Sequence, residues 1–124
     1  MATHGSFYWN ELMTTEPEKA AQFYAALTGA TVDPMPMAFG TYHVLKKDGV
    51  PLGGIMAMPP DAPPMPNHWF SYMAVDDADE AVTRVRELGG AIYKEPFEVP
   101  DVGRIAVIAD STGAALGIIT PVPR

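Results

Sequence analysis

The feature that most limits the fold of this 124-residue chain is an internal repeat. The segment WNELMTTEPEKAAQFYAALTGA, which starts at Trp9, aligns with FSYMAVDDADEAVTRVRELGGA, which starts 61 residues later at Phe70. The alignment pairs Leu27 with Leu88, and the related segments GGIMAMP and LGIITPVP close the two copies. Because an overlooked repeat changes the prediction of the whole fold, we treat the chain as two copies of one structural unit.

Each copy predicts the element order β-α-β-β-β. An aromatic-rich alternating run predicts the first strand, and apolar residues at helical spacing predict the helix that follows. Turn residues then separate three further predicted strands, at 30–32, 42–46 and 52–58 in the first copy and at 91–95, 104–109 and 115–120 in the second. The sequence therefore predicts an α+β fold in a single domain, 1–124, with module one at about 5–58, a Pro-rich connector at 59–67 and module two at about 68–121.

The ends of the two helices carry recognisable signals. Thr15 and Glu18 have the spacing of a capping box, and Asp76 is the matching cap in the second copy. Gly29 and Gly89–Gly90 are suited to the left-handed conformation that ends many helices. We therefore expect both helices to begin and end at equivalent places in the repeat.

Composition excludes several classes of protein. The chain has no cysteine, which excludes disulfides, thiolate metal sites and a cysteine nucleophile. Its formal net charge of −7 opposes binding to a phosphate backbone, so we expect no nucleic-acid partner. No apolar run approaches the length of a membrane span, and the start has no secretion signal. We therefore expect a cytoplasmic protein that does not bind membranes.

The repeat also resembles a known family. The segments that carry the resemblance are FYWNELMTTEPEKAAQFYAALTG, PLGGIMAMP, NHWFSYMAVDDADEAVTRVRELGG and GRIAVIADSTGAALGIITP, which together cover nearly the whole chain. They resemble the vicinal oxygen chelate superfamily, which includes glyoxalase, the bleomycin resistance proteins and the extradiol dioxygenases. The resemblance implies two βαβββ modules whose strands form a cupped, mixed β-sheet around the ligand, with helices outside. It also implies a homodimer.

The resemblance places the metal ligands of the family enzymes at Trp9, Gly54, Phe70 and Gly117. None of these residues can bind a divalent metal through its side chain. We therefore expect no metal and no cofactor, with the rings of Trp9 and Phe70 in the space of the ion and the glycines leaving room for close approach. In the alternative, both rings only pack the interior and leave no pocket.

Strand alternation extends this predicted ligand site. The predicted ligand-binding residues are Trp9, Met13, Gly54, Met56, Met58, Phe70, Tyr72 and Gly117, with Arg104 at the rim to receive an anionic group and Tyr42, Tyr93 and Asn67 as further rim candidates. Glu11 is the predicted catalytic residue, because a carboxylate on an apolar face must be paired, solvated or protonated. A structural hydrogen bond, or an ion pair with Arg104, is the alternative role for Glu11.

Three functions remain open. The first is binding of a small apolar or aromatic molecule without a metal, and the second is a metal-independent enzyme that uses Glu11 as general acid or base. The third is a metal-dependent lyase or dioxygenase, which would need a new ligand set such as Glu11, His43 and His68. The sequence does not decide whether a reaction is catalysed, nor the identity of the ligand.

Overall fold

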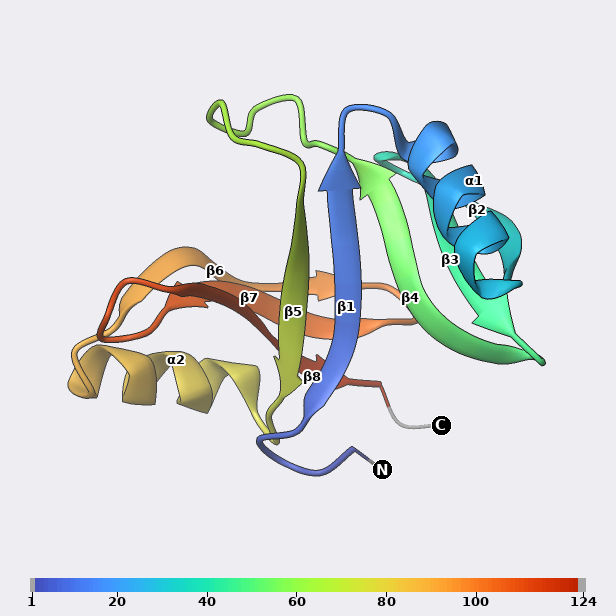
Figure 1. Cartoon of the computed structure of the whole chain (residues 1–124). Coiled ribbons are helices and arrows are strands. Elements are labelled where there is room, and N and C mark those ends of the chain that lie inside the picture. Colours follow the sequence, from blue (N-terminus) through green and yellow to red (C-terminus); the bar gives the residue numbers. More distant parts are fainter. Residues whose placement is uncertain (1, 123–124) are drawn as a thin grey trace. The chain divides into compact units, whose positions relative to one another are not determined.

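The computed structural model describes residues 2–122 and contains, in that range, eight strands and two helices (Figure 1). In chain order they are β1 (Phe7–Thr14), α1 (Pro17–Thr28), β2 (Thr31–Met37), β3 (Gly40–Lys47), β4 (Val50–Ala57), β5 (His68–Ala74), α2 (Ala78–Glu87), β6 (Ala91–Val99), β7 (Gly103–Ala109) and β8 (Ala115–Pro121). The predicted α+β class and both β-α-β-β-β orders are confirmed. Neither helix has the length and apolar character needed to cross a lipid bilayer.

The first compact unit spans Trp9–Phe70. Its strands lie in the order β2-β3-β4-β1, in which β1 runs parallel to β4 and the other neighbours are antiparallel. Helix α1 covers one face of these strands, where Ala21 packs with Leu12, Leu45 and the fully buried Ile55. The residues that alternate with Leu12 on β1 therefore lie on the opposite face, which carries no helix.

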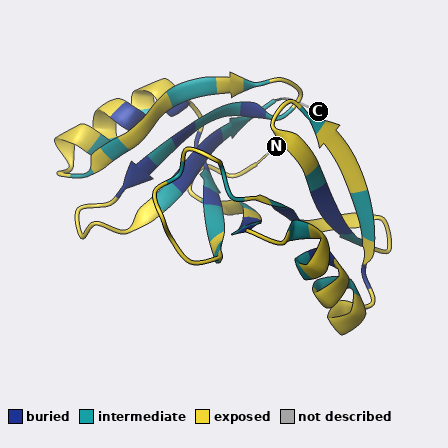
Figure 2. Cartoon of the chain, turned by 90° about the horizontal axis from the view of Figure 1, so that it is seen from above, coloured by how far each residue is buried: buried dark blue, intermediate teal, exposed yellow. Residues whose placement is uncertain are grey.

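The second compact unit comprises the described parts of Met1–Tyr8 and Ser71–Arg124. Its strands lie in the order β5-β8-β7-β6, and β5 runs parallel to β8 as β1 does to β4. Helix α2 packs on one face of these strands through buried apolar residues, namely Ala78, Val82, Ala106, Ile108 and Ile118. Both helices present mostly exposed residues away from their strands (Figure 2). That the two units form one domain stays a prediction.

Helix α1 begins differently from the prediction. The helix starts at Pro17, and its N-cap is Glu16, which makes no side-chain capping hydrogen bond. The Thr14 hydroxyl instead accepts a hydrogen bond from the Glu16 backbone N–H at 3.1 Å. The capping box predicted from Thr15 and Glu18 is therefore wrong. A proline in the first turn lacks one of the amides that a cap would satisfy, which reduces the need for one.

Helix α2 does have a side-chain cap, one residue later than predicted. Asp77, rather than Asp76, accepts hydrogen bonds from the backbone N–H of Asp79 at 3.0 Å and of the next residue at 3.1 Å. The left-handed helix ends are confirmed at Gly29, with φ of 76°, and at Gly89, with φ of 86°. The repeat therefore predicts where each helix ends more accurately than where it begins.

Strands β2 and β6 run well past their predicted ends because prolines are tolerated in them. Strand β2 continues through Pro34 and Pro36, which lie two residues apart on the outer strand of their unit. Prolines at that spacing direct their missing N–H to the same side, away from β3, so the ladder is kept. Strand β6 continues past Pro96, where its register with β7 is irregular.

Candidate functional site

Three side chains on the helix-free face of the first unit form a hydrogen-bonded group. Trp9 and Glu11 come from β1, two residues apart and therefore on the same face, and Tyr42 comes from β3. The Trp9 indole Nε1–H donates to Tyr42 Oη at 2.7 Å. The Tyr42 hydroxyl donates in turn to Glu11 Oε1 at 2.8 Å. We call these three side chains the tyrosine bridge.

Gly54 provides the space for this bridge. It is the register partner of Glu11, on the neighbouring strand β4. A Cβ atom placed on Gly54 would lie 2.0 Å from Tyr42 Oη and 2.2 Å from Tyr42 Cζ, distances that no real side chain could keep. The Tyr42 phenol therefore occupies the volume that a side chain at position 54 would fill.

Burial fixes the protonation of the phenol. Loss of solvent raises the pKa of Tyr42 well above its usual value, and the nearby Glu11 carboxylate raises it further. Glu11 itself is buried, with 7% of its surface exposed. Because an indole N–H can only donate, the Tyr42 hydroxyl accepts from Trp9 and directs its own proton to the carboxylate.

The side chains at the four family positions do not fit a metal ion. At Trp9 the only polar atom is a donor, and at Gly54 the side-chain space belongs to the Tyr42 hydroxyl. Phe70 and Gly117 likewise have no side-chain atom that binds a divalent metal. Among residues 2–122, no group of three or more His, Asp or Glu side chains is arranged to hold an ion, so Glu11, His43 and His68 form no such group.

Two other predicted ligand-binding residues, one on β1 and one on β4, extend the helix-free face of the first unit. Met13 and Met56 are register partners on β1 and β4, and both are half-buried. Met58 follows β4, and its backbone N–H donates to the Thr14 carbonyl at 2.9 Å. Phe70 is half-buried on β5. The tyrosine bridge therefore has an apolar, sulfur-containing surface beside it.

The second unit separates its predicted site residues onto two faces. Tyr72 and Gly117 are register partners on β5 and β8 and face away from α2. Arg104 of β7 points to the α2 side, where its Nε lies 2.6 Å from Asp79 Oδ2 and its Nη1 lies 3.6 Å from Glu98 Oε1. The structure therefore does not bring Arg104 together with Tyr72 and Gly117.

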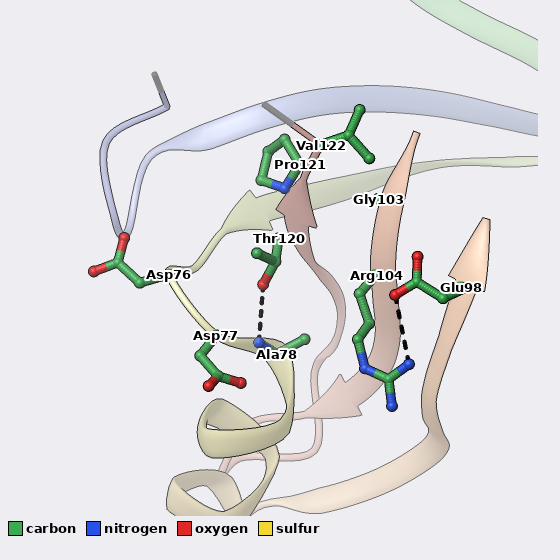
Figure 3. A pocket seen from close by; sticks show the side chains of 9 residues that line it. All are labelled: Asp76, Asp77, Ala78, Glu98, Gly103, Arg104, Thr120, Pro121 and Val122. Carbon is green, nitrogen blue, oxygen red and sulfur yellow. Dashed lines mark hydrogen bonds and ion pairs between the residues drawn. The ribbon is translucent and has the colours of Figure 1, made fainter. Parts of the chain in front are cut away.

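Arg104 lines an open depression of about 260 Å³ at the N-terminal end of α2, shown in Figure 3. The Arg104 guanidinium lowers the pKa of Asp79 below its usual value through a hydrogen bond. In the same depression the Thr120 hydroxyl accepts a hydrogen bond from the Ala78 backbone N–H at 2.9 Å. These contacts join the first turn of α2 to β7 and β8, which is a structural role.

Tyr42, one of three residues that the sequence predicts at the rim of the site, is instead the central member of the tyrosine bridge. Of the other two, Asn67 accepts a hydrogen bond from the Thr15 backbone N–H at 3.0 Å, and Tyr93 is 62% exposed on β6. The sequence does contain a signal for this role of Tyr42. Gly54 lies where the family enzymes carry a metal ligand, and a glycine in a strand leaves room for a ring from a neighbouring strand.

Comparison with known proteins agrees with this architecture. Residues 7–118 match the family described as the Glyoxalase/Bleomycin resistance protein/Dioxygenase superfamily. The chain belongs to this superfamily. The resemblance predicted from the sequence is therefore confirmed, and the matched residues include most of both compact units.

Curated relatives of this glyoxalase-superfamily chain are longer than the chain itself. A Mycobacterium tuberculosis protein named "Putative glyoxylase CFP32" is 42% identical over 121 residues, which are 97% of this chain and 46% of the relative. The "Anthracycline biosynthesis protein DnrV" of Streptomyces peucetius is 34% identical over 128 residues, which cover 92% of this chain and 46% of the relative. The chain thus spans a little under half the length of these relatives.

Solved structures support the fold alone, since their sequences are distant. The hypothetical protein BH1468 from Bacillus halodurans superposes with a TM-score of 0.74 at 11% identity, covering 98% of both chains. Methylmalonyl-CoA epimerase from Mycobacterium tuberculosis superposes with a TM-score of 0.67 at 17% identity, covering 99% of this chain and 93% of the epimerase. At such identities the activity of a neighbour does not transfer.

Proposed function

We propose that this glyoxalase-superfamily chain binds a small apolar or aromatic organic molecule on the helix-free face of its first unit, without a metal ion. The observation that carries the proposal is the tyrosine bridge, in which the Tyr42 hydroxyl fills the side-chain space of Gly54. A metal centre at this place would need ligand atoms that neither Trp9 nor Gly54 provides. A few placed polar groups on an apolar surface are typical of small-molecule sites.

The residues beside the bridge favour a flat ligand. Trp9 offers an aromatic ring, and aromatic rings pack on one another with defined geometry. Met13 and Met56 supply flexible, polarisable side chains that adapt to the shape of a partner. The name of one relative, the Anthracycline biosynthesis protein DnrV, links that protein to anthracycline biosynthesis, which supports including an anthracycline among the candidate ligands.

Calorimetric titration and thermal-shift measurements with an anthracycline and with simpler aromatic compounds test the proposal. We expect saturable binding, and a ligand at about 100 times its Kd should stabilise the fold by about 2.7 kcal/mol. The Glu11→Gln variant should bind at least about tenfold more weakly, a loss of about 1.4 kcal/mol. Glu18→Gln, which changes an exposed carboxylate on α1, is the matched control. Equal affinity in the two variants would contradict a role for Glu11.

A second candidate function is metal-independent catalysis with Glu11 as general acid or base. The specific observation in its favour is the burial of the Glu11 carboxylate on the face that carries the proposed ligand, because a carboxyl group held close to a bound molecule can act as its general acid or base. Mass spectrometry of each bound compound after prolonged incubation tests it. Product that forms with the native chain and not with Glu11→Gln supports catalysis, and unchanged compound in every case supports binding alone.

We also propose that two copies of the chain associate as a homodimer. Phe23 and Leu27, which lie one turn apart on the same face of α1, are both more than half exposed. Neighbouring apolar side chains that are exposed together can mark a surface that contacts a partner. Light scattering over a range of concentrations tests this, and a mass of one chain at every concentration would contradict it.

A further inference from the structure

The tyrosine bridge narrows the chemistry of the ligand, an inference that rests on the proposed function. Trp9 Nε1 and Glu11 Oε1 lie so that a single oxygen atom reaches both, at 2.7 and 2.8 Å. The indole N–H can only donate a hydrogen bond, and an ionised carboxylate can only accept one. A hydroxyl satisfies both, because it accepts and donates at the same atom. A carbonyl oxygen cannot donate to Glu11, and an anionic group would be repelled by it.

The space around that oxygen is shaped for a ring. The ring of Tyr42 covers Gly54, whose absent Cβ would lie 2.4 Å from Tyr42 Cε2. Phe39 meets the Tyr42 ring edge to face, with centroids 6.3 Å apart and an interplanar angle of 86°. Phe39 is 56% exposed in the turn between β2 and β3, so the side of the ring away from Gly54 is close to the surface.

We propose that Tyr42 is an internal substitute for the ligand, and that the site takes molecules carrying an uncharged aromatic hydroxyl. Such a ligand displaces the Tyr42 phenol and places its own hydroxyl between Trp9 Nε1 and Glu11 Oε1. The exchange breaks two hydrogen bonds and forms two of the same kind, so it costs little. We call the space between Trp9 Nε1 and Glu11 Oε1 that the Tyr42 phenol occupies the slot. Tyr42 competes with the ligand for the slot, so the apparent Kd equals the intrinsic Kd divided by the fraction of molecules in which the slot is open.

The experiment uses para-cresol as probe, because it has the same heavy atoms as a tyrosine side chain. Toluene lacks the hydroxyl and benzoate carries a negative charge, so these two compounds test the two parts of the proposal. The chain has two tryptophans, and Trp69→Phe leaves Trp9 as the sole reporter for fluorescence and for the indole N–H resonance. In this background Tyr42→Ala opens the slot, and Tyr93→Ala removes an exposed tyrosine from β6 as the matched control.

The Tyr42→Ala variant should bind para-cresol at least about tenfold more tightly than the Trp69→Phe parent or the Tyr93→Ala control, because the internal competitor is gone. Toluene and benzoate should each bind at least about tenfold more weakly than para-cresol, since neither can bridge the two polar atoms. The Trp9 indole N–H resonance should move in Tyr42→Ala and return toward its original position when para-cresol is added. Equal affinity for para-cresol and toluene, or no gain over the control, overturns the inference.

A second Tyr42 variant and a comparison of two negative results complete the experiment. If Tyr42→Ala does not fold, Tyr42→Val replaces it, since valine is favoured in strands and is still much smaller than tyrosine. In one negative result, the parent binds aromatic compounds while neither Tyr42 variant gains affinity for para-cresol. That result overturns the inference that Tyr42 occupies the place of the ligand and leaves the proposed function in place. Absence of any aromatic binding, by the parent and by the variants, overturns the proposed function as well.

Discussion

Gly54 acts at the residue scale through the side chain that it lacks. Its Cβ position is 2.0 Å from Tyr42 Oη, so Gly54→Ala forces the phenol out of the tyrosine bridge or strains the strand. We expect a loss of about 1–3 kcal/mol in the free energy of unfolding, as for other overpacked sites. Urea denaturation measures this loss, and the Trp9 indole N–H resonance reports whether its hydrogen bond to Tyr42 has broken.

A double-mutant cycle provides the control for that prediction. If the clash with Tyr42 is the cause, Gly54→Ala should cost clearly less in a Tyr42→Ala background than in the native chain. Additive costs would show that the loss comes from the β4 backbone and would remove the link between Gly54 and the ring.

The raised pKa of Tyr42 predicts how stability depends on alkaline pH. An unfolded tyrosine loses its proton near pH 10, whereas folded Tyr42 keeps its proton above that pH. The unfolded state therefore binds fewer protons, and the free energy of unfolding should fall as pH rises above about 10, by up to about 1.4 kcal/mol per pH unit from this group. Urea denaturation at several pH values should show a shallower fall for Tyr42→Phe. The exposed Tyr93→Phe should follow the native chain, and parallel curves for all three proteins would refute the burial of the phenol.

At the scale of single elements, the N-terminus of α2 offers a direct test of the cap. Asp77→Ala removes the acceptor of two backbone hydrogen bonds and should lower the free energy of unfolding by about 1 kcal/mol. Asp76→Ala changes the adjacent exposed carboxylate and should cost less than about 0.5 kcal/mol. Thermal and urea denaturation of both variants measures the difference, and a larger cost at Asp76 would restore the cap predicted from sequence.

The order of the elements could be predicted from the sequence, because the repeat states it twice and hydrophobic periodicity distinguishes strands from helices. The start of α1 could not, since a proline at position 17 changes which amides need a partner. The full lengths of β2 and β6 could not either. A proline is read as a strand end unless one knows that the strand lies at the edge of its unit or has an irregular register.

The candidate site could be predicted in part. Trp9, Glu11 and Gly54 were expected to lie near one another, and within the first unit they do, because β1 and β4 are parallel neighbours. The role of Tyr42 in the tyrosine bridge could not be predicted. It lies 31 residues from Glu11 in sequence, and its reach across β4 depends on how the strands are arranged and on the rotamer of its side chain.

For the whole molecule, we predict that stability is independent of divalent metals. A chelator should leave Tm unchanged, and added Zn²⁺, Mn²⁺ or Fe²⁺ should not raise it, since the four family positions provide no ligand atoms. Elemental analysis of freshly purified protein should find less than one metal ion per chain. A stoichiometric metal, together with a lower Tm after chelation, would contradict the proposed metal-free site.

The contact between Gly54 and Tyr42 also has an evolutionary consequence. A Cβ atom at position 54 would occupy the space of the Tyr42 ring, so substitutions at positions 54 and 42 are coupled. Among homologous sequences, a residue larger than glycine should appear at position 54 only where position 42 is no longer tyrosine. Covariation between the two columns of a family alignment would then separate members with a filled slot from members free to hold an ion there.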